Sequence, residues 1–181
     1  MSMLKRLWWA GLFGIALTGI VFFLGCEALP FEFDVPVQSS TTIEKGTLLE
    51  TVIGDFGFSD LTTFDISNTQ QFKNNNAQKD QVVTAKMTKL TLSITEPADQ
   101  NFDFLDSITF YVAATGEEKT KIASKTIPKG VRTFELELEE VDLAKFIKKD
   151  SISITTDVKG RRPSKNTTVK IDANFRIGAR L

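Results

Sequence analysis

The stretch TVKIDANFRI, residues 168–177, decides the fold of this chain. Its odd-numbered residues are apolar, and its even-numbered residues are polar or charged. Successive side chains of a β-strand point to opposite faces, so this period of two predicts a strand with one buried face. Such a strand needs neighbours to complete its backbone hydrogen bonds and a second layer to cover its apolar side.

The same alternation returns along most of the chain upstream of this stretch. It predicts strands at 31–37, 62–66, 81–95, 108–114, 121–127, 134–138 and 152–158, with turns at 115–118, 128–130 and 159–166. Seven or eight amphipathic strands joined by short turns are typical of two packed antiparallel sheets. We therefore expect an all-β antiparallel β-sandwich, immunoglobulin-like or jelly-roll-like, and an open barrel is the alternative.

Two irregularities in the pattern carry further expectations. Pro36 lies within the first strand and cannot donate a backbone hydrogen bond, which favours an edge strand or a non-bonded position there. That strand has a Ser- and Thr-rich continuation to residue 46. In 81–95 the apolar residues are odd-numbered up to Met87 and even-numbered from Leu90 onward, which predicts a bulge near Thr88 and Lys89.

Two short helices are expected between the strands. Residues 69–75 are polar apart from Phe72, which predicts a helix anchored on one ring across the end of a sheet; a loop is the alternative. In 142–149, Leu143, Phe146 and Ile147 share one helical face, and Asp142 is a suitable N-cap. This second helix is expected to close one end of the sandwich. The core is expected to include the side chains Phe110, Leu136, Ile154 and Ile171.

The N-terminus has a different character. Lys5 and Arg6 precede an almost unbroken apolar run, 7–24, and Gly25 and Cys26 follow. A basic start, an apolar segment and a small residue at the cut are the parts of a secretory signal peptide. Cys26 is the only cysteine of the chain. A lone cysteine directly after that small residue gives the segment a second meaning.

This segment resembles the leader of bacterial lipoprotein precursors. In that family the leader is cut before the cysteine, whose sulfur and new amino group then carry acyl chains. The resemblance implies a signal helix at 1–25, a lipidated Cys26 and one mature domain at 26–181. It also implies that Glu27, where an Asp favours retention in the inner membrane of enteric bacteria, favours the outer membrane. An uncleaved anchor is the alternative, because about 18 apolar residues just span a bilayer.

The composition limits the chemistry. Loss of Lys5 and Arg6 with the leader makes the net charge of −1 more negative, which argues against nucleic acid as a partner. The chain has no histidine, so a Ser-His-Asp or Cys-His catalytic group is excluded. With Cys26 used for lipid, no disulfide forms within the domain. We expect no enzyme activity and no cofactor.

Asp99, Asn101 and Asp103, with Asp106 nearby, have the alternating oxygen ligands of a calcium loop. The full pattern is absent, since Phe104 replaces the turn glycine and Phe110 replaces the closing carboxylate. An ordinary acidic connection is therefore the favoured interpretation, and no metal is expected.

Two charged groups complete the candidates. Glu135, Glu137, Glu139 and Glu140 form an acidic stripe, which is the solvent face of a strand, a cation site or a contact for a basic partner. Arg161 and Arg162, with Lys159 and Lys165, form a basic turn. Arginine pairs bind phosphate and carboxylate, so this turn is a candidate contact for lipid phosphates, lipopolysaccharide or an acidic protein; a solvated turn is the simpler alternative.

The sequence therefore predicts a non-enzymatic lipoprotein of the bacterial envelope, anchored through Cys26 to the outer membrane. Its domain would face the periplasm or the cell surface and bind another protein. The strand order is loosely similar to that of β-sandwich lipoproteins of Gram-negative bacteria, although no motif carries this likeness. The alternative is a sandwich that binds an apolar ligand such as a lipid between its phenylalanine-rich sheets.

Overall fold

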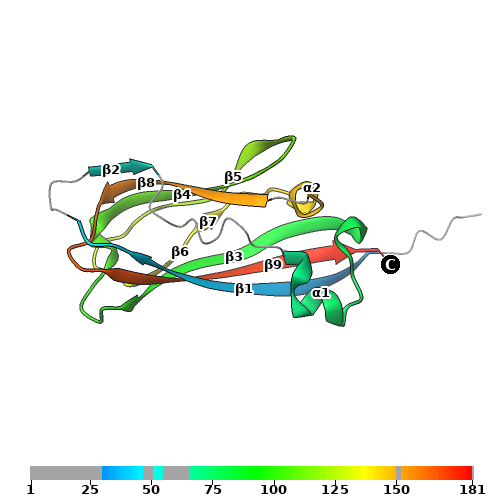
Figure 1. Cartoon of the computed structure of the whole chain (residues 1–181), viewed down its shortest axis with the longest axis horizontal. Coiled ribbons are helices and arrows are strands. Elements are labelled where there is room, and N and C mark those ends of the chain that lie inside the picture. The colour runs from blue at the N-terminus through cyan, green and yellow to red at the C-terminus, as the bar shows by residue number, and fades with distance from the viewer. Residues whose placement is uncertain (1–29, 47–50, 55–65, 150–151, 181) are drawn as a thin grey trace, which may run out of the picture.

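The computed structural model describes residues 30–46, 51–54, 66–149 and 152–180. These residues form a four-stranded and a five-stranded sheet, and every strand pairing between them is antiparallel. The two sheets pack face to face, so the expected antiparallel β-sandwich is confirmed. Both sheets run along the long axis of the molecule (Figure 1), which gives the sandwich two distinct ends.

The four-stranded sheet has the order β1-β9-β3-β6. Its strands are β1 (Phe31–Ile43), β9 (Thr167–Ala179), β3 (Val82–Glu96) and β6 (Thr133–Glu135). β1 is an edge strand, as Pro36 predicted, and it continues through the Ser- and Thr-rich segment to Ile43. Its register with β9 runs from Phe31 opposite Ala179 to Ile43 opposite Thr167.

The five-stranded sheet has the order β2-β8-β4-β5-β7. Its strands are β2 (Thr51–Gly54), β8 (Ile152–Arg161), β4 (Leu105–Ala114), β5 (Glu117–Thr126) and β7 (Glu137–Leu138). β5 begins earlier than predicted, at Glu117, because the β4–β5 hairpin turns tightly with Gly116 at a positive φ of 80°.

The segment 134–138 was predicted as one strand, and that prediction is wrong. β6 pairs with β3, placing Phe134 opposite Leu92, whereas β7 pairs with β5, placing Leu138 opposite Ala123. The chain therefore crosses from one sheet to the other at Leu136, which is 4% exposed. Because β6 and β7 are edge strands of different sheets, this crossing joins the two layers along one side of the sandwich.

The predicted bulge of β3 is present. The register between β3 and β9 shifts between Met87 and Lys89, and Ala85 and Leu90 are buried on either side of it. Thr88 at the bulge donates through Oγ1 to the Asn174 carbonyl, at 3.2 Å. A second shift follows Val82, so that Val82 is buried in place of Val83, the residue that the sequence pattern had placed on the inner face.

Both short helices form, at one end of the sandwich, which we call the helical end (Figure 1). α1 (Gln70–Asn74) buries Phe72 completely, and the Phe72 ring contacts the Phe33 ring edge-on at 5.2 Å. Single 3₁₀ turns flank it as η2 (Ile66–Asn68) and η3 (Lys79–Gln81), and a third, η4 (Phe102–Phe104), precedes β4.

α2 (Ala144–Ile147) is shorter than the predicted 142–149, because the backbone leaves the helix after one turn. Leu143, Phe146 and Ile147 are buried as expected, and α2 contacts both β3 and β4. It therefore packs against one strand of each sheet, which is how it closes the helical end. The opposite end, which we call the loop end, holds the connections 97–101, 127–132 and 162–166.

The predicted core is confirmed at three of its four positions. Phe110, Leu136 and Ile171 are buried, whereas Ile154 is half-buried and packs against the core. Ile154 lies on β8 beyond Val158, where the pairing with the short β2 stops. No described strand covers that part of β8, which accounts for the exposure.

Several expectations fall outside the described residues: the signal segment 1–25, Cys26 and nearly all of the predicted strand 62–66. Within the described ranges, no helix is long and apolar enough to span a membrane.

Candidate functional site

The fold brings the calcium-like loop and the basic turn together at the loop end. Lys165 of the β8–β9 loop places its Nζ 2.5 Å from Asp99 Oδ2 in the β3–β4 connection. The hydrogen bond and the positive charge of Lys165 hold the pKa of Asp99 below its ordinary value. Both side chains are largely exposed, so the pair contributes little to stability, and its effect is to join the two loops.

One side-chain oxygen of each of Asn101, Asp103 and Asp106 also lies close to a protein donor. Asn101 Oδ1 accepts from the Asp103 backbone N at 3.1 Å and caps η4, while Asp103 Oδ1 accepts from the Gly130 N at 2.5 Å. Asp106 lies 3.4 Å from the Nζ of Lys129. These contacts fasten 127–132 to η4 and to the start of β4. No cluster of three or more His, Cys, Asp or Glu side chains suited to a metal occurs in the described part of the chain.

The basic turn differs from the arrangement expected at 159–166. β8 continues through Arg161, so only 162–166 form the loop. Arg161 is exposed, whereas Arg162 is half-buried. A Cβ added to Gly46 would lie 2.5 Å from Cβ and Cδ of Arg162, so the Arg162 stem packs directly on the Gly46 backbone.

The segment after β1 holds this loop in place. Gly46 N donates to the Pro163 carbonyl at 3.1 Å, and Lys45 N donates to Asn166 Oδ1 at 3.0 Å. The two arginines therefore do not form a single two-arginine site for phosphate or carboxylate. Arg161 is the one that faces solvent at the end of β8, and Lys165 is already paired with Asp99.

The acidic stripe is exposed, and part of it is paired. Glu137 lies 2.9 Å from the Nζ of Lys125 on the neighbouring strand β5, and this hydrogen bond lowers the pKa of Glu137. Glu139 lies 2.6 Å from Lys121 Nζ, which raises the pKa of Lys121. Glu135 belongs to the other sheet, opposite Thr91. The stripe is thus divided between two sheets and does not form one continuous surface.

Two small apolar cavities lie between the sheets. One, of about 40 Å³, lies beneath α2, and the other, of about 20 Å³, lies nearer the middle of the sandwich. Residues common to both linings are Met87, Ile122, Ile154 and Phe175. Known ligand pockets usually have volumes of about 300–1,000 Å³, so neither cavity has room for a lipid chain.

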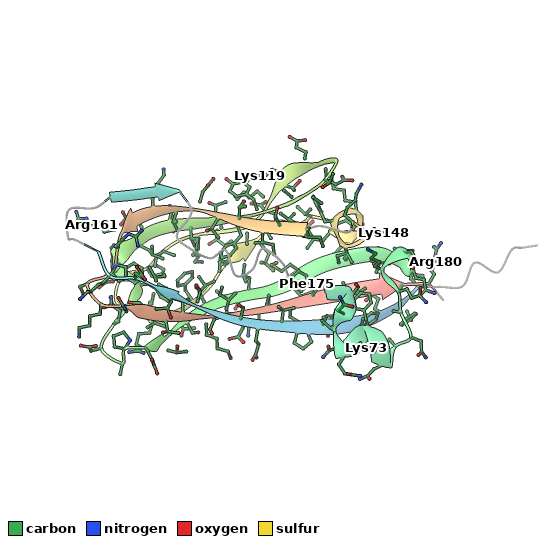
Figure 2. All side chains as sticks on the ribbon, in the orientation of Figure 1. Lys73, Lys119, Lys148, Arg161, Phe175 and Arg180 are labelled. Atoms are coloured by element: carbon green, nitrogen blue, oxygen red, sulfur yellow. The ribbon has the colours of Figure 1, made fainter. Side chains whose placement is uncertain are left out.

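The helical end brings together basic residues that the sequence pattern did not connect. β1 begins at Phe31, five residues after Cys26, and Phe31 lies opposite Ala179 near the end of β9. Figure 2 shows Lys73, Lys148 and Arg180 at this end and Arg161 at the other. Sequence analysis missed these three residues, since they are more than 30 positions apart in the chain; the only local signal was that both short helices carry lysines and no carboxylate.

No family model matches the chain, and no curated protein matches it either. Among solved structures, the chain is similar to the decameric BFDV capsid protein, with 11% sequence identity and a TM-score of 0.39. The likeness covers 84% of this chain and 99% of the capsid protein chain. A similarity at this level carries no inference about function.

Proposed function

We propose that this chain is a non-enzymatic lipoprotein of the bacterial envelope, held to the outer membrane by acyl chains on Cys26, whose β-sandwich binds another protein. The observation that supports it most is the short spacing between Cys26 and the start of β1. An extended chain spans at most about 3.6 Å per residue, so the five residues from Cys26 reach about 18 Å. The domain is then tethered closely by one defined end.

The length of the sandwich supports the second half of the proposal. β1 and β9 pair along 13 residues, which at about 3.3 Å per residue separates the helical end from the loop end by about 40 Å. A tether at the helical end allows the loop end, with exposed Arg161, to lie farthest from the bilayer. That is the position in which a surface meets a protein partner and not the lipid headgroups of its own membrane.

The apolar-ligand alternative receives no support from the described residues. An apolar cavity of about 150 Å³ binds a molecule as small as benzene, whereas the two apolar cavities between the sheets measure about 40 and 20 Å³.

The anchor is tested by the substitution Cys26→Ser in cells fed a labelled fatty acid. We expect the parent protein to incorporate label and to fractionate with the outer membrane, and Cys26→Ser to lose the label and to accumulate at the mass of the precursor. Glu27→Gln is the matched control, since it keeps the thiol and should keep the label. A Cys26→Ser protein that matures to the parent's mass and stays in the membrane fraction contradicts the proposal.

A further inference from the structure

The position of the anchor limits how far the start of β1 lies from the bilayer. If Cys26 carries the acyl chains, the start of β1 stays within about 18 Å of the membrane surface, because five residues of chain reach no farther. The parts of the fold beside Phe31 are the end of β9 and α1, which packs Phe72 against Phe33 of β1. The helical end is therefore the part of the domain nearest the headgroups.

The two helices at this end carry basic side chains and no acidic ones. α1 contributes Lys73, and the segment 143–149 contributes Lys145, Lys148 and Lys149. Lys73 and Lys148 are exposed, and neither forms an ion pair with a described residue. Arg180, directly after β9, is exposed on the same end (Figure 2).

Part of the acidic charge at the helical end is neutralised internally. Glu117 of the β4–β5 hairpin lies 3.0 Å from Lys149 and 3.4 Å from Lys145, and its pKa is lowered chiefly by the hydrogen bond to Lys149. Asp34 pairs with Arg176 through two hydrogen bonds. Glu32, Asp80, Glu118 and Asp142 remain exposed. Lys73 and Lys148 take no part in these pairs.

An aromatic group lies among these cations. The rings of Phe31 and Phe33 stack with centroids 5.7 Å apart, and both side chains are only half-buried. Basic side chains combined with half-exposed aromatic rings are typical of surfaces that rest in the headgroup region of a bilayer. The chemistry of this end is therefore complementary to that of a membrane surface with anionic lipids.

We propose that the helical end docks on the anionic headgroups of the bilayer that holds Cys26, through Lys73, Lys148 and Arg180, and so fixes the sandwich with its loop end outward. This inference rests on the proposed function, since it requires the anchor. Without such contacts a lipid on Cys26 ties the domain to the membrane but leaves its tilt free. With them, Arg161 is held about 40 Å from the surface, the length of 13 strand residues.

The test uses the full lipidated protein, purified in detergent and reconstituted into vesicles of phosphatidylcholine alone or of phosphatidylcholine mixed with phosphatidylglycerol. A thiol-reactive fluorophore is attached at Asn74→Cys on α1 or at Ser164→Cys in the β8–β9 loop. Both positions are exposed, and the native thiol is blocked by lipid. A lipid with a quencher on its headgroup then reports which end lies near the membrane.

We expect the label at Asn74→Cys to be quenched more strongly in the vesicles that contain phosphatidylglycerol, and the label at Ser164→Cys to be unaffected. A lysine near an anionic surface favours binding by about fivefold, so Lys73→Glu with Lys148→Glu should lower the docked population by about tenfold or more. Added salt should have the same effect, since it screens these charges. Lys89→Glu with Lys159→Glu makes the same charge change on exposed strand positions and should not alter quenching.

Flotation of the protein with the vesicles is measured first. A parent protein that does not float shows that the anchor is absent, which overturns the proposed function and the docking with it. A protein that floats but shows equal quenching at Asn74→Cys in both kinds of vesicle overturns the docking alone. Stronger quenching at Ser164→Cys than at Asn74→Cys also overturns it, because the loop end would then face the bilayer.

Discussion

Lys165 Nζ and Asp99 Oδ2 lie 2.5 Å apart at the loop end, so the basic turn and the calcium-like loop are parts of one surface. The two residues are 66 positions apart in the chain. The carboxylate of Asp99 made its loop a candidate metal site, and the ammonium group of Lys165 made its turn a candidate anion site. In the structure these two charges pair with each other. Arg161, at the end of β8, is an exposed cation on this surface.

The pairing predicts how Asp99 titrates. Lys165 lowers the pKa of Asp99 in the folded protein, so the stabilisation from this pair is fully present above the pKa of the unfolded chain and is lost as the pH falls through the lowered folded pKa. Lys165→Gln should return the pKa of Asp99 part of the way to its ordinary value, because Arg132 also lowers it. Carbon-detected NMR of the carboxylates measures this. Lys129→Gln, which removes the partner of Asp106, should leave Asp99 unchanged.

The orientation of β4 predicts the effect of a core truncation. Phe110 is 1% exposed between the sheets, and Phe110→Ala should lower the free energy of unfolding by about 3–5 kcal/mol through the cavity that it leaves. Thr109→Ala, on the opposite face of the same strand, should change it by about 0.5 kcal/mol or less. Urea unfolding measures both. A loss below about 1 kcal/mol for Phe110→Ala would contradict the facing of β4.

The local alternation of apolar and polar residues was enough to predict most strands and their inner faces. This is so because side-chain direction in a strand depends only on residue parity. The switch of parity between Met87 and Leu90 located the bulge of β3 for the same reason. Pro36 indicated an edge strand because a residue without a backbone N–H disfavours a position with a hydrogen-bonded strand on each side.

The alternation of apolar and polar residues does not indicate which of the two sheets a strand joins. Phe134, Leu136 and Leu138 alternate in the same way whether 134–138 belongs to one sheet or crosses between two. The crossing is set by partners elsewhere in the chain, Leu92 for Phe134 and Ala123 for Leu138. The sequence did not predict the contacts of the loop end for the same reason, since these contacts join residues that only the tertiary fold brings together.

Asp142 couples the bulged strand β3 to α2, which predicts a structural role for its carboxylate. Asp142 Oδ1 accepts from the backbone N of Ala85 and from that of Ala144, both at 3.0 Å. Asp142→Ala removes both bonds and leaves the donor of buried Ala85 unpaired, so it should cost about 1–3 kcal/mol. Asp142→Asn keeps an acceptor oxygen and should cost less. Thermal unfolding compares them, and equal losses would show that the acceptor is not what matters.

The exposed end of β8 predicts where a protein partner binds. Arg161→Glu should leave the free energy of unfolding within about 0.5 kcal/mol of the parent, because the side chain is exposed. Under the proposed function, it should weaken crosslinking of the protein to envelope proteins in cells, and salt should weaken binding of the isolated complex in the same way. Arg162→Ala should instead lower stability, by about 1 kcal/mol, since its stem packs on Gly46.

Lys159→Glu, two residues earlier on the same exposed face of β8, is the matched control for charge. If Arg161→Glu and Lys159→Glu reduce crosslinking equally, net charge and not Arg161 governs association; if neither reduces it, the end of β8 is a solvated turn and the partner binds elsewhere.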